Sequence, residues 1–194
     1  MESRIIIGLG NPGKKYETTR HNFGFLVVER LAKNFKIALS KNEAYQGMLG
    51  QKNLEGNMLN LFLPLTFVNN SGEAVLKLVK RKKFSAENIL VVCDDLNLDF
   101  GQLRLKAGGS DGGHHGLQSI ITSLADDSFV RLRLGIGRPE NREDVVGYVL
   151  TPFTPEEKGN LPALLDKAVE CCEAWLLKGT EKTMNQFNKR KKDE

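Results

Sequence analysis

Two short runs of aliphatic residues place the strongest constraint on the fold of this chain. Residues 4–9 read RIIIGL and residues 88–93 read NILVVC, and glycine or aspartate follows each run at once. Short apolar runs without polar alternation are typical of strands that are buried on both faces of a sheet. Such a sheet needs helices on both sides to cover it. The chain is therefore predicted to be an α/β protein.

Periodic segments fill the rest of the chain. Apolar residues at helical spacing predict helices at 22–34, 71–83, 116–124, 155–177 and 180–188. Alternating or apolar stretches predict a hairpin of 45–51 with 57–63, and further strands at 102–106 and 130–137. Because strands alternate with helices, we expect a single-domain, three-layer α/β/α fold around a twisted mixed sheet. This domain is expected to span residues 1–188, with a disordered basic tail at 189–194.

Composition and charge describe an ordinary globular chain. Of 194 residues, 40% are hydrophobic and 27% are charged, which excludes collagen-like, wholly disordered and coiled-coil classes. The 28 Lys and Arg residues against 24 Asp and Glu give a net charge of +4, and several of the cations lie near the C-terminus. A nearly neutral body produces no strong global field, so any attraction for a polyanion must come from local basic patches.

Cysteine usage and hydropathy bear on the cellular compartment. The three cysteines are Cys93, Cys171 and Cys172, an odd number that includes an adjacent pair and lacks CxxC spacing. They indicate reduced thiols and a cytoplasmic location. No uncharged apolar run reaches the roughly 18 residues that a membrane span needs, and the first residues lack the core of a signal peptide. We therefore expect no membrane partner.

Polar side chains follow the ends of several predicted strands. Asn11 follows the first strand, Asn69 follows the second strand of the hairpin, and Asp94 follows the strand at 88–93. Sites in open α/β sheets gather at the carboxyl ends of strands, so these side chains are expected to converge. His21, just before a predicted helix, is the best candidate for a general base, with Asp94 orienting its imidazole. A structural histidine beside a capping aspartate is the alternative.

Two other kinds of chemistry receive weaker support. Cys93 closes an apolar strand and is more often buried than nucleophilic. Gly8, Gly10 and Gly13 match the GxGxxG spacing of dinucleotide-binding folds, but residues 14–20 lack the apolar periodicity of the helix that should follow. A tight turn that needs glycine is therefore favoured over a nucleotide site.

A glycine-rich segment, GGSDGGHHG at 108–116, is too rich in glycine for regular structure. It lacks the Lys-Ser/Thr ending of a phosphate-binding P-loop, so a mobile lid, a surface of backbone donors or a plain linker remain open. His114 and His115 are adjacent, and adjacent histidines are poor ligands for one ion. A metal site would need His21, Cys93, Asp94 or Asp95 alongside one of them, and we expect no metal and no cofactor.

Four segments together resemble one family. They are GLGNPGKKYETTRHNFG at 8–24, LPLTFVNNSGEAV at 63–75, CDDLNLDFGQLRLKAGGSDGGHHGL at 93–117 and RLRLGIGRP at 131–139. In this order they resemble bacterial peptidyl-tRNA hydrolases over most of the chain. The resemblance implies a monomeric, metal-free α/β hydrolase whose substrate is peptidyl-tRNA. Such an enzyme cuts the ester between the peptide and the 3′ ribose, which releases tRNA for recycling.

The resemblance also implies roles for individual residues. His21 matches the catalytic base, Asp94 its orienting carboxylate, and Asn11 and Asn69 the catalytic amides. Residues that match the substrate-binding set are Tyr16, Phe67, Asn69, His114 and His115, and those that match the clamp for the tRNA phosphate are Lys106 and Arg133. Two positions depart from the family pattern, since His115 replaces the usual Asn and Val68 the usual Met.

Two rival functions belong to other classes. An RNA-binding module without turnover is one, because a chloroplast intron-splicing factor resembles this hydrolase. A dinucleotide-dependent oxidoreductase is the other, on the GxGxxG match alone. The presence of His21, Asp94, Asn11 and Asn69 together favours the enzyme over both.

Overall fold

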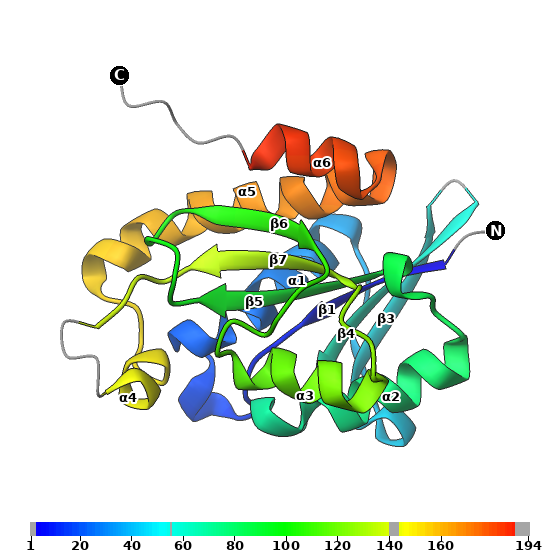
Figure 1. Cartoon of the computed structure of the whole chain (residues 1–194), viewed down its shortest axis with the longest axis horizontal. Helices are drawn as coiled ribbons and strands as arrows, with labels where there is room; N and C mark the ends of the chain where they lie inside the picture. The colour runs from blue at the N-terminus through cyan, green and yellow to red at the C-terminus, as the bar shows by residue number, and fades with distance from the viewer. Residues whose placement is uncertain (1–2, 55, 140–143, 189–194) are drawn as a thin grey trace.

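A computed structural model of the chain describes residues 3–54, 56–139 and 144–188. Within these residues, seven strands and six α-helices follow one another (Figure 1): β1 Ser3–Gly8, α1 Phe23–Phe35, β2 Ser40–Asn42, β3 Gly47–Leu54, β4 Asn57–Pro64, α2 Ser71–Lys82, β5 Ile89–Asp95, β6 Leu103–Ala107, α3 His115–Leu124, β7 Val130–Gly135, α4 Val145–Val149, α5 Pro155–Lys178 and α6 Thr180–Phe187. The tail expected at 189–194 lies outside the described residues.

The strands form one mixed sheet in the order β2-β3-β4-β1-β5-β7-β6. The four central strands run parallel, whereas β2, β3 and β6 pair antiparallel at the two sides. The chain moves from β1 to β4 on one side and then to β5 on the other. The order of strands therefore switches direction at β1, which is where open α/β sheets leave a crevice.

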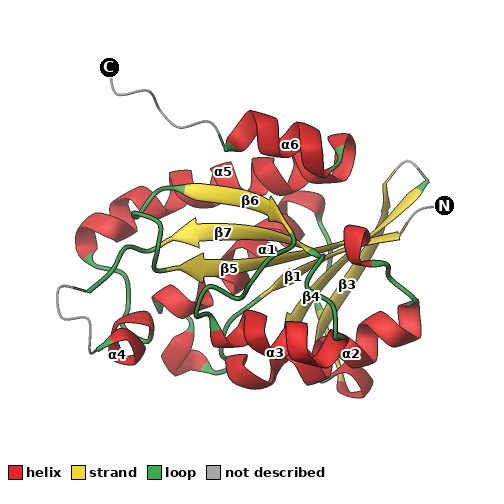
Figure 2. Cartoon of the chain, in the orientation of Figure 1, coloured by secondary structure: helices red, strands yellow, loops and turns green. Residues whose placement is uncertain are grey.

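Two hydrophobic clusters cover the two faces of this sheet. Ile6, Leu90 and Val92 pack with side chains of α1 and α5, while Ile5 and Val91 pack with side chains of α2 and α3. Because successive residues of a strand point to opposite faces, an uninterrupted apolar run supplies both clusters. Figure 2 shows the helices on either side of the sheet. The predicted three-layer α/β/α fold is confirmed.

The N-terminus of α1 lies directly on the first strand. A β-carbon on Gly8 would collide with the carbonyl group of Gly24, and one on Gly24 would collide with Val92 O and the backbone of Leu9. Residues 14–16 then form only a short 3-10 turn. Gly8 therefore allows helix and strand to pack closely, and the helix that a dinucleotide site needs does not follow Gly13.

Most predicted elements occur within one or two residues of their expected bounds, with three differences. Tyr45 lies in a 3-10 turn, so the hairpin begins at Gly47, and β2 and α4 were not predicted. β2 has three residues and α4 has five, and segments this short do not complete a recognisable period. No helix in the described part of the chain has the length and apolar character that crossing a lipid bilayer requires.

The helix α6 covers the edge strand β6. The side-chain amide of Asn188 accepts a hydrogen bond from Leu105 N at 2.9 Å and donates one to Leu105 O at 2.8 Å. It thereby takes the place of a neighbouring strand and protects an edge that is otherwise open to pairing. This contact fixes the strand that carries Lys106.

Candidate active site

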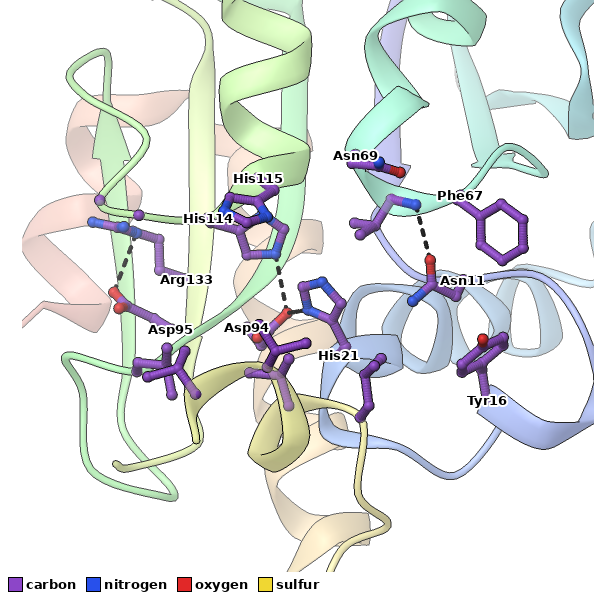
Figure 3. A pocket seen from close by; sticks show the side chains of 18 of the residues that line it. Asn11, Tyr16, His21, Phe67, Asn69, Asp94, Asp95, His114, His115 and Arg133 are labelled. Atoms are coloured by element: carbon purple, nitrogen blue, oxygen red, sulfur yellow. Dashed lines mark hydrogen bonds and ion pairs between the residues drawn. The ribbon is translucent and has the colours of Figure 1, made fainter. Parts of the chain in front are cut away.

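A cavity of about 690 Å³ opens at the carboxyl ends of the central strands. Its lining includes the following residues: Asn11, Tyr16, His21, Phe67, Asn69, Asp94, His114, His115 and Arg133. Figure 3 shows these side chains around one opening. The convergence that was predicted from the strand ends is confirmed for Asn11, Asn69, Asp94 and His21. Of the candidate residues, only Lys106 lies outside this lining.

The centre of the site is one carboxylate oxygen shared by two imidazoles (Figure 3). Asp94 Oδ1 lies 2.9 Å from His21 Nδ1 and 3.1 Å from His114 Nε2, and the centroids of the two imidazole rings are 4.9 Å apart. All three side chains are buried. A carboxylate that faces two ring nitrogens accepts a hydrogen from each, so both rings direct an N–H group at Asp94.

Which ring nitrogen of His114 carries the hydrogen follows from the position of this residue at the start of α3. Its Nδ1 accepts hydrogen bonds from Gly116 N at 3.1 Å and Leu117 N at 3.2 Å, as an N-cap side chain does. The single ring hydrogen must therefore be on Nε2, where it faces Asp94. Sequence reasoning placed His114 among substrate-binding residues, and that role stays a prediction. The geometry shows that His114 caps a helix and holds Asp94.

The His21 ring is held for proton transfer. Its Nδ1–H points at Asp94, and no partner for Nε2 is found among the described residues, so Nε2 is available in the cavity. Burial lowers the pKa of His21, but the charge and the hydrogen bond of Asp94 outweigh burial and raise it overall. Burial likewise opposes ionisation of Asp94, and its two imidazole partners nevertheless lower its pKa far below the ordinary value.

The turn that carries His21 also fixes Asn11. Asn22 accepts from Asn11 N at 2.8 Å and donates to Asn11 O at 3.0 Å. The side-chain oxygen of Asn11 accepts from Val68 N at 2.9 Å, so its NH₂ group is the part left for a ligand. Asn11 can therefore donate to a carbonyl oxygen. Asn69 is exposed at the rim, and its amide has no partner among the described residues.

An apolar wall forms the other part of the cavity. It consists of Phe67 and Val68 together with residues of α4 and the residue that follows this helix. The α4 residues are Val145, Val146 and Val149, and the residue after them is Leu150. Tyr16 meets Phe67 edge to face, with ring centroids 6.4 Å apart. The α4 residues were missed by sequence reasoning. The available signal was the apolar pairing at 145–146 and 149–150, which places these residues on one face of a helix.

Basic side chains lie beneath the glycine-rich segment. Arg133 pairs with Asp95 at 3.1 Å and donates to Asp111 O at 3.2 Å. Arg131, which is fully buried, donates to the carbonyls of Gly109, Ser110 and Asp127. A β-carbon at Gly112 would collide with the Arg133 guanidinium, so glycine is needed where the backbone crosses it.

Lys106 lies at the border of this basic region. It is exposed on the edge strand, and a β-carbon on Gly109 would lie 2.9 Å from its amino group and 3.5 Å from Arg131 Nη1. Lys106, Arg131 and Arg133 therefore bring three positive charges to one patch beside the cavity. Sequence reasoning named Lys106 and Arg133 and missed Arg131.

Other chemistries lose support from the geometry. Burial raises the pKa of the Cys93 thiol far above its ordinary value, which disfavours the thiolate that a nucleophilic cysteine needs. His21, Asp94 and His114 offer ligand atoms within 4.8 Å of one another, the spacing of a metal site. A metal on His114 Nε2 would move the ring hydrogen to Nδ1 and break the cap of α3. The arrangement therefore favours a hydrogen-bonded triad.

The fold and this site together define a three-layer α/β protein in which a buried histidine–aspartate pair faces an open cavity. The sequence profile of the family described as peptidyl-tRNA hydrolase matches residues 5–194. The chain belongs to the peptidyl-tRNA hydrolase family.

Named relatives and solved structures agree with this assignment. The chain is 42% identical to the peptidyl-tRNA hydrolase of Syntrophotalea carbinolica, over 96% of this chain and 97% of that protein. It is 45% identical to the one of Bacillus subtilis, over 95% and 97%. The crystal structure of peptidyl-tRNA hydrolase from Acinetobacter baumannii superimposes with a TM-score of 0.90 at 38% identity, covering 95% of this chain and 94% of that one.

Proposed function

We propose that this chain hydrolyses the ester bond of peptidyl-tRNA with His21 as the general base. The observation that carries the proposal is the His21–Asp94 pair, which leaves Nε2 of the imidazole open to the cavity. Membership of the family supports the substrate class. An ester to ribose is activated compared with an amide, so base-assisted attack by water is sufficient for cleavage.

The reaction balances with groups of this chain and one water. His21 Nε2 takes a proton from water as the water oxygen bonds to the acyl carbon. The tetrahedral intermediate then collapses, the bond to the ribose 3′ oxygen breaks, and that oxygen takes the proton back from the imidazolium. The products are a free peptide acid and tRNA with a free 3′ hydroxyl. Asp94 keeps the proton of His21 on Nδ1 and stabilises the imidazolium.

The two asparagines supply donors around the scissile bond. Asn69, whose side-chain amide lies at the rim and has no partner among the described residues, holds the attacking water or the developing oxyanion. Asn11 donates its NH₂ group to a peptide carbonyl, because its oxygen is already bonded to Val68 N. An aminoacyl-tRNA ends in a free amine and lacks that carbonyl, so this contact selects peptidyl-tRNA. Tyr16, Phe67 and His115 complete the surface that binds the peptide end.

The basic patch beside the cavity is the proposed contact for a tRNA phosphate. Lys106 and Arg133 supply the charge, and Arg131 holds the glycine-rich segment over them. Contacts to phosphate carry no base sequence, which suits an enzyme that accepts many tRNAs. The expectation of a monomeric, cytoplasmic enzyme whose domain ends near residue 188 stays a prediction.

Lys106→Ala tests the phosphate contact. We expect KM to rise several-fold with little loss of kcat, because an exposed cation that binds phosphate adds affinity but does not take part in the chemistry. The dependence of binding on salt should also flatten, by roughly one counterion for one lost contact. Lys33→Ala is the matched control, since Lys33 is exposed on α1, at the opposite face of the sheet. An unchanged salt slope in Lys106→Ala contradicts the assignment.

Chelation tests whether His21, Asp94 and His114 act without a metal. Dialysis of the purified protein against EDTA should leave kcat/KM unchanged, because the ring hydrogens occupy the positions that an ion would need. Loss of activity that returns when Zn²⁺ or Mn²⁺ is added would establish a metal site instead.

The overall function is tested by one assay on the full chain. Peptidyl-tRNA and the matching aminoacyl-tRNA are incubated with the protein, and release of free peptide or amino acid is measured. We expect cleavage of peptidyl-tRNA and at least roughly a hundredfold slower cleavage of aminoacyl-tRNA, on the scale of the discrimination that a lost buried hydrogen bond produces. Binding of tRNA without any release would favour the RNA-binding alternative.

A further inference from the structure

The residue just before the general base contacts a different part of the molecule. Arg20, His21 and Asn22 form one 3-10 turn whose three side chains are all buried. His21 faces Asp94 and Asn22 binds the backbone of Asn11, as described above. Arg20 contacts α4 and α5, and no step of the proposed reaction uses it.

The Arg20 guanidinium forms hydrogen bonds with α5 and with the connection between α4 and α5. It forms a two-point contact with Glu157 of α5, at 3.3 Å from Nε to Oε1 and 2.6 Å from Nη2 to Oε2. It also donates to Thr151 Oγ1 at 2.6 Å and Pro152 O at 3.1 Å, in the connection between α4 and α5. Its carbon Cζ lies 4.4 Å from the ring centroid of Tyr148 in α4.

Two partners of Arg20, Glu157 and Tyr148, are themselves held by further contacts. Glu157 Oε2 accepts from Thr154 N at 2.7 Å and Thr154 Oγ1 accepts from Glu157 N at 3.2 Å, which closes the capping box of α5. The Tyr148 hydroxyl donates to Ile136 O at 2.5 Å, at the end of β7. Arg20 N donates to Thr151 O at 3.1 Å. This network is rigid because a planar guanidinium fixes several acceptors in one geometry.

The short helix held in this way supplies the apolar wall of the cavity. Five large apolar side chains are exposed among the described residues, and four of them line the cavity, three being Val145, Val146 and Leu150. Clustered apolar exposure of this kind marks a binding surface. In Figure 3 the yellow α4 ribbon lies close to His21, on the side away from α3.

We propose that Arg20 is a positioning residue that sets where the α4 wall stands relative to His21. This inference rests on the proposed function, in which the wall binds an apolar side chain of the peptide next to the ester. Arg20 therefore determines how well the enzyme distinguishes peptides with a large apolar side chain from those without one. A single turn thus places the base, the carbonyl-binding amide and the peptide-binding wall with respect to one another.

The role of Arg20 in positioning α4 differs from an electrostatic effect on the pKa of His21. Burial lowers the pKa of His21, and the charge and hydrogen bond of Asp94 raise it. The charge of Arg20 is also paired with Glu157. Loss of Arg20 is therefore expected to change substrate preference without moving the pH midpoint of kcat/KM.

Arg20→Gln is tested with two substrates on the same tRNA, one carrying N-acetyl-leucine and the other N-acetyl-glycine. For the wild type we expect kcat/KM to favour leucine by about tenfold or more, the scale at which a hydrophobic pocket discriminates. In Arg20→Gln this ratio should fall to about one or two, mainly through a higher KM for the leucyl substrate. A change in the amount of folded protein alters both substrates equally and leaves the ratio unchanged.

Arg30→Gln is the matched control. Arg30 of α1 likewise pairs with a carboxylate of α5, that of Asp166, at 2.6 and 2.9 Å, but it has no hydrogen bond to α4 among the described residues. Glu157→Gln provides a second variant that loosens the same contact if Arg20→Gln does not fold. An unchanged leucine-to-glycine ratio in the folded variants, or an equal change in Arg30→Gln, overturns the inference. If the wild type cleaves neither substrate, the proposed function fails first, and the inference falls with it.

Discussion

Replacing His21 by alanine is expected to lower kcat by at least about a hundredfold, within the range of roughly 10²- to 10⁴-fold that a positioned general base contributes. The reason is that Asp94 holds the His21 ring through Nδ1, while Nε2 faces the cavity without a partner among the described residues. KM for peptidyl-tRNA should change little, because the amides, the apolar wall and the basic patch remain. Single-turnover cleavage at saturating enzyme measures the chemical step without product release.

A second histidine of the cavity gives the control for this experiment. His115 is exposed at the start of α3, whereas the hydrogen bonds of Asp94 within the described residues go to His21 and His114. His115→Ala is therefore expected to act on KM and to leave the single-turnover rate within a few-fold of the wild type. Cleavage by His21→Ala close to the wild-type rate, with tRNA still bound, would remove His21 from the mechanism.

The site could be predicted in outline because of a property of parallel sheets. Asn11, Asn69 and Asp94 lie far apart in the chain, yet Asn11 and Asn69 follow strands and Asp94 lies at the end of β5, and the carboxyl ends of parallel strands share one edge of the sheet. Recognising the strands from short apolar runs was therefore enough to bring these residues together. The same reasoning selected His21, since it directly precedes a helix that packs on the first strand.

What the sequence could not provide depends on contacts between distant segments. Arg131 lies between apolar residues in a strand. This pattern does not predict that its guanidinium donates hydrogen bonds to the carbonyl groups of Gly109 and Ser110. Likewise, adjacent His114 and His115 look equivalent in the sequence, but only His114 is buried and caps α3. The contacts of Arg20 join residues more than 120 positions apart, so no local pattern predicts them.

Asp94→Asn is the second substitution with a large expected effect. The carboxylate accepts a hydrogen from His21 and another from His114, whereas an amide oxygen does so without the negative charge, or the amide turns its NH₂ group toward His21. In the second case the proton of His21 moves to Nε2, and the base faces water with the wrong nitrogen protonated. We expect kcat to fall by about a hundredfold, and by no more than the loss of the base itself.

The pH dependence of Asp94→Asn distinguishes its charge from its geometry. His21 acts as a base only when neutral, so kcat/KM falls as the pH drops below the pKa of His21. Asp94 raises that pKa by stabilising the imidazolium, and burial lowers it. Removing the charge leaves burial to dominate, so the residual activity should keep its acid limb but at a lower pH than in the wild type. Asp95→Asn is the matched control, because Asp95 is next in the same strand but pairs with Arg133. It should alter KM through the basic patch and leave the midpoint in place. A midpoint in Asp94→Asn that stays fixed or moves to higher pH contradicts the assignment of Asp94 as the partner of the base.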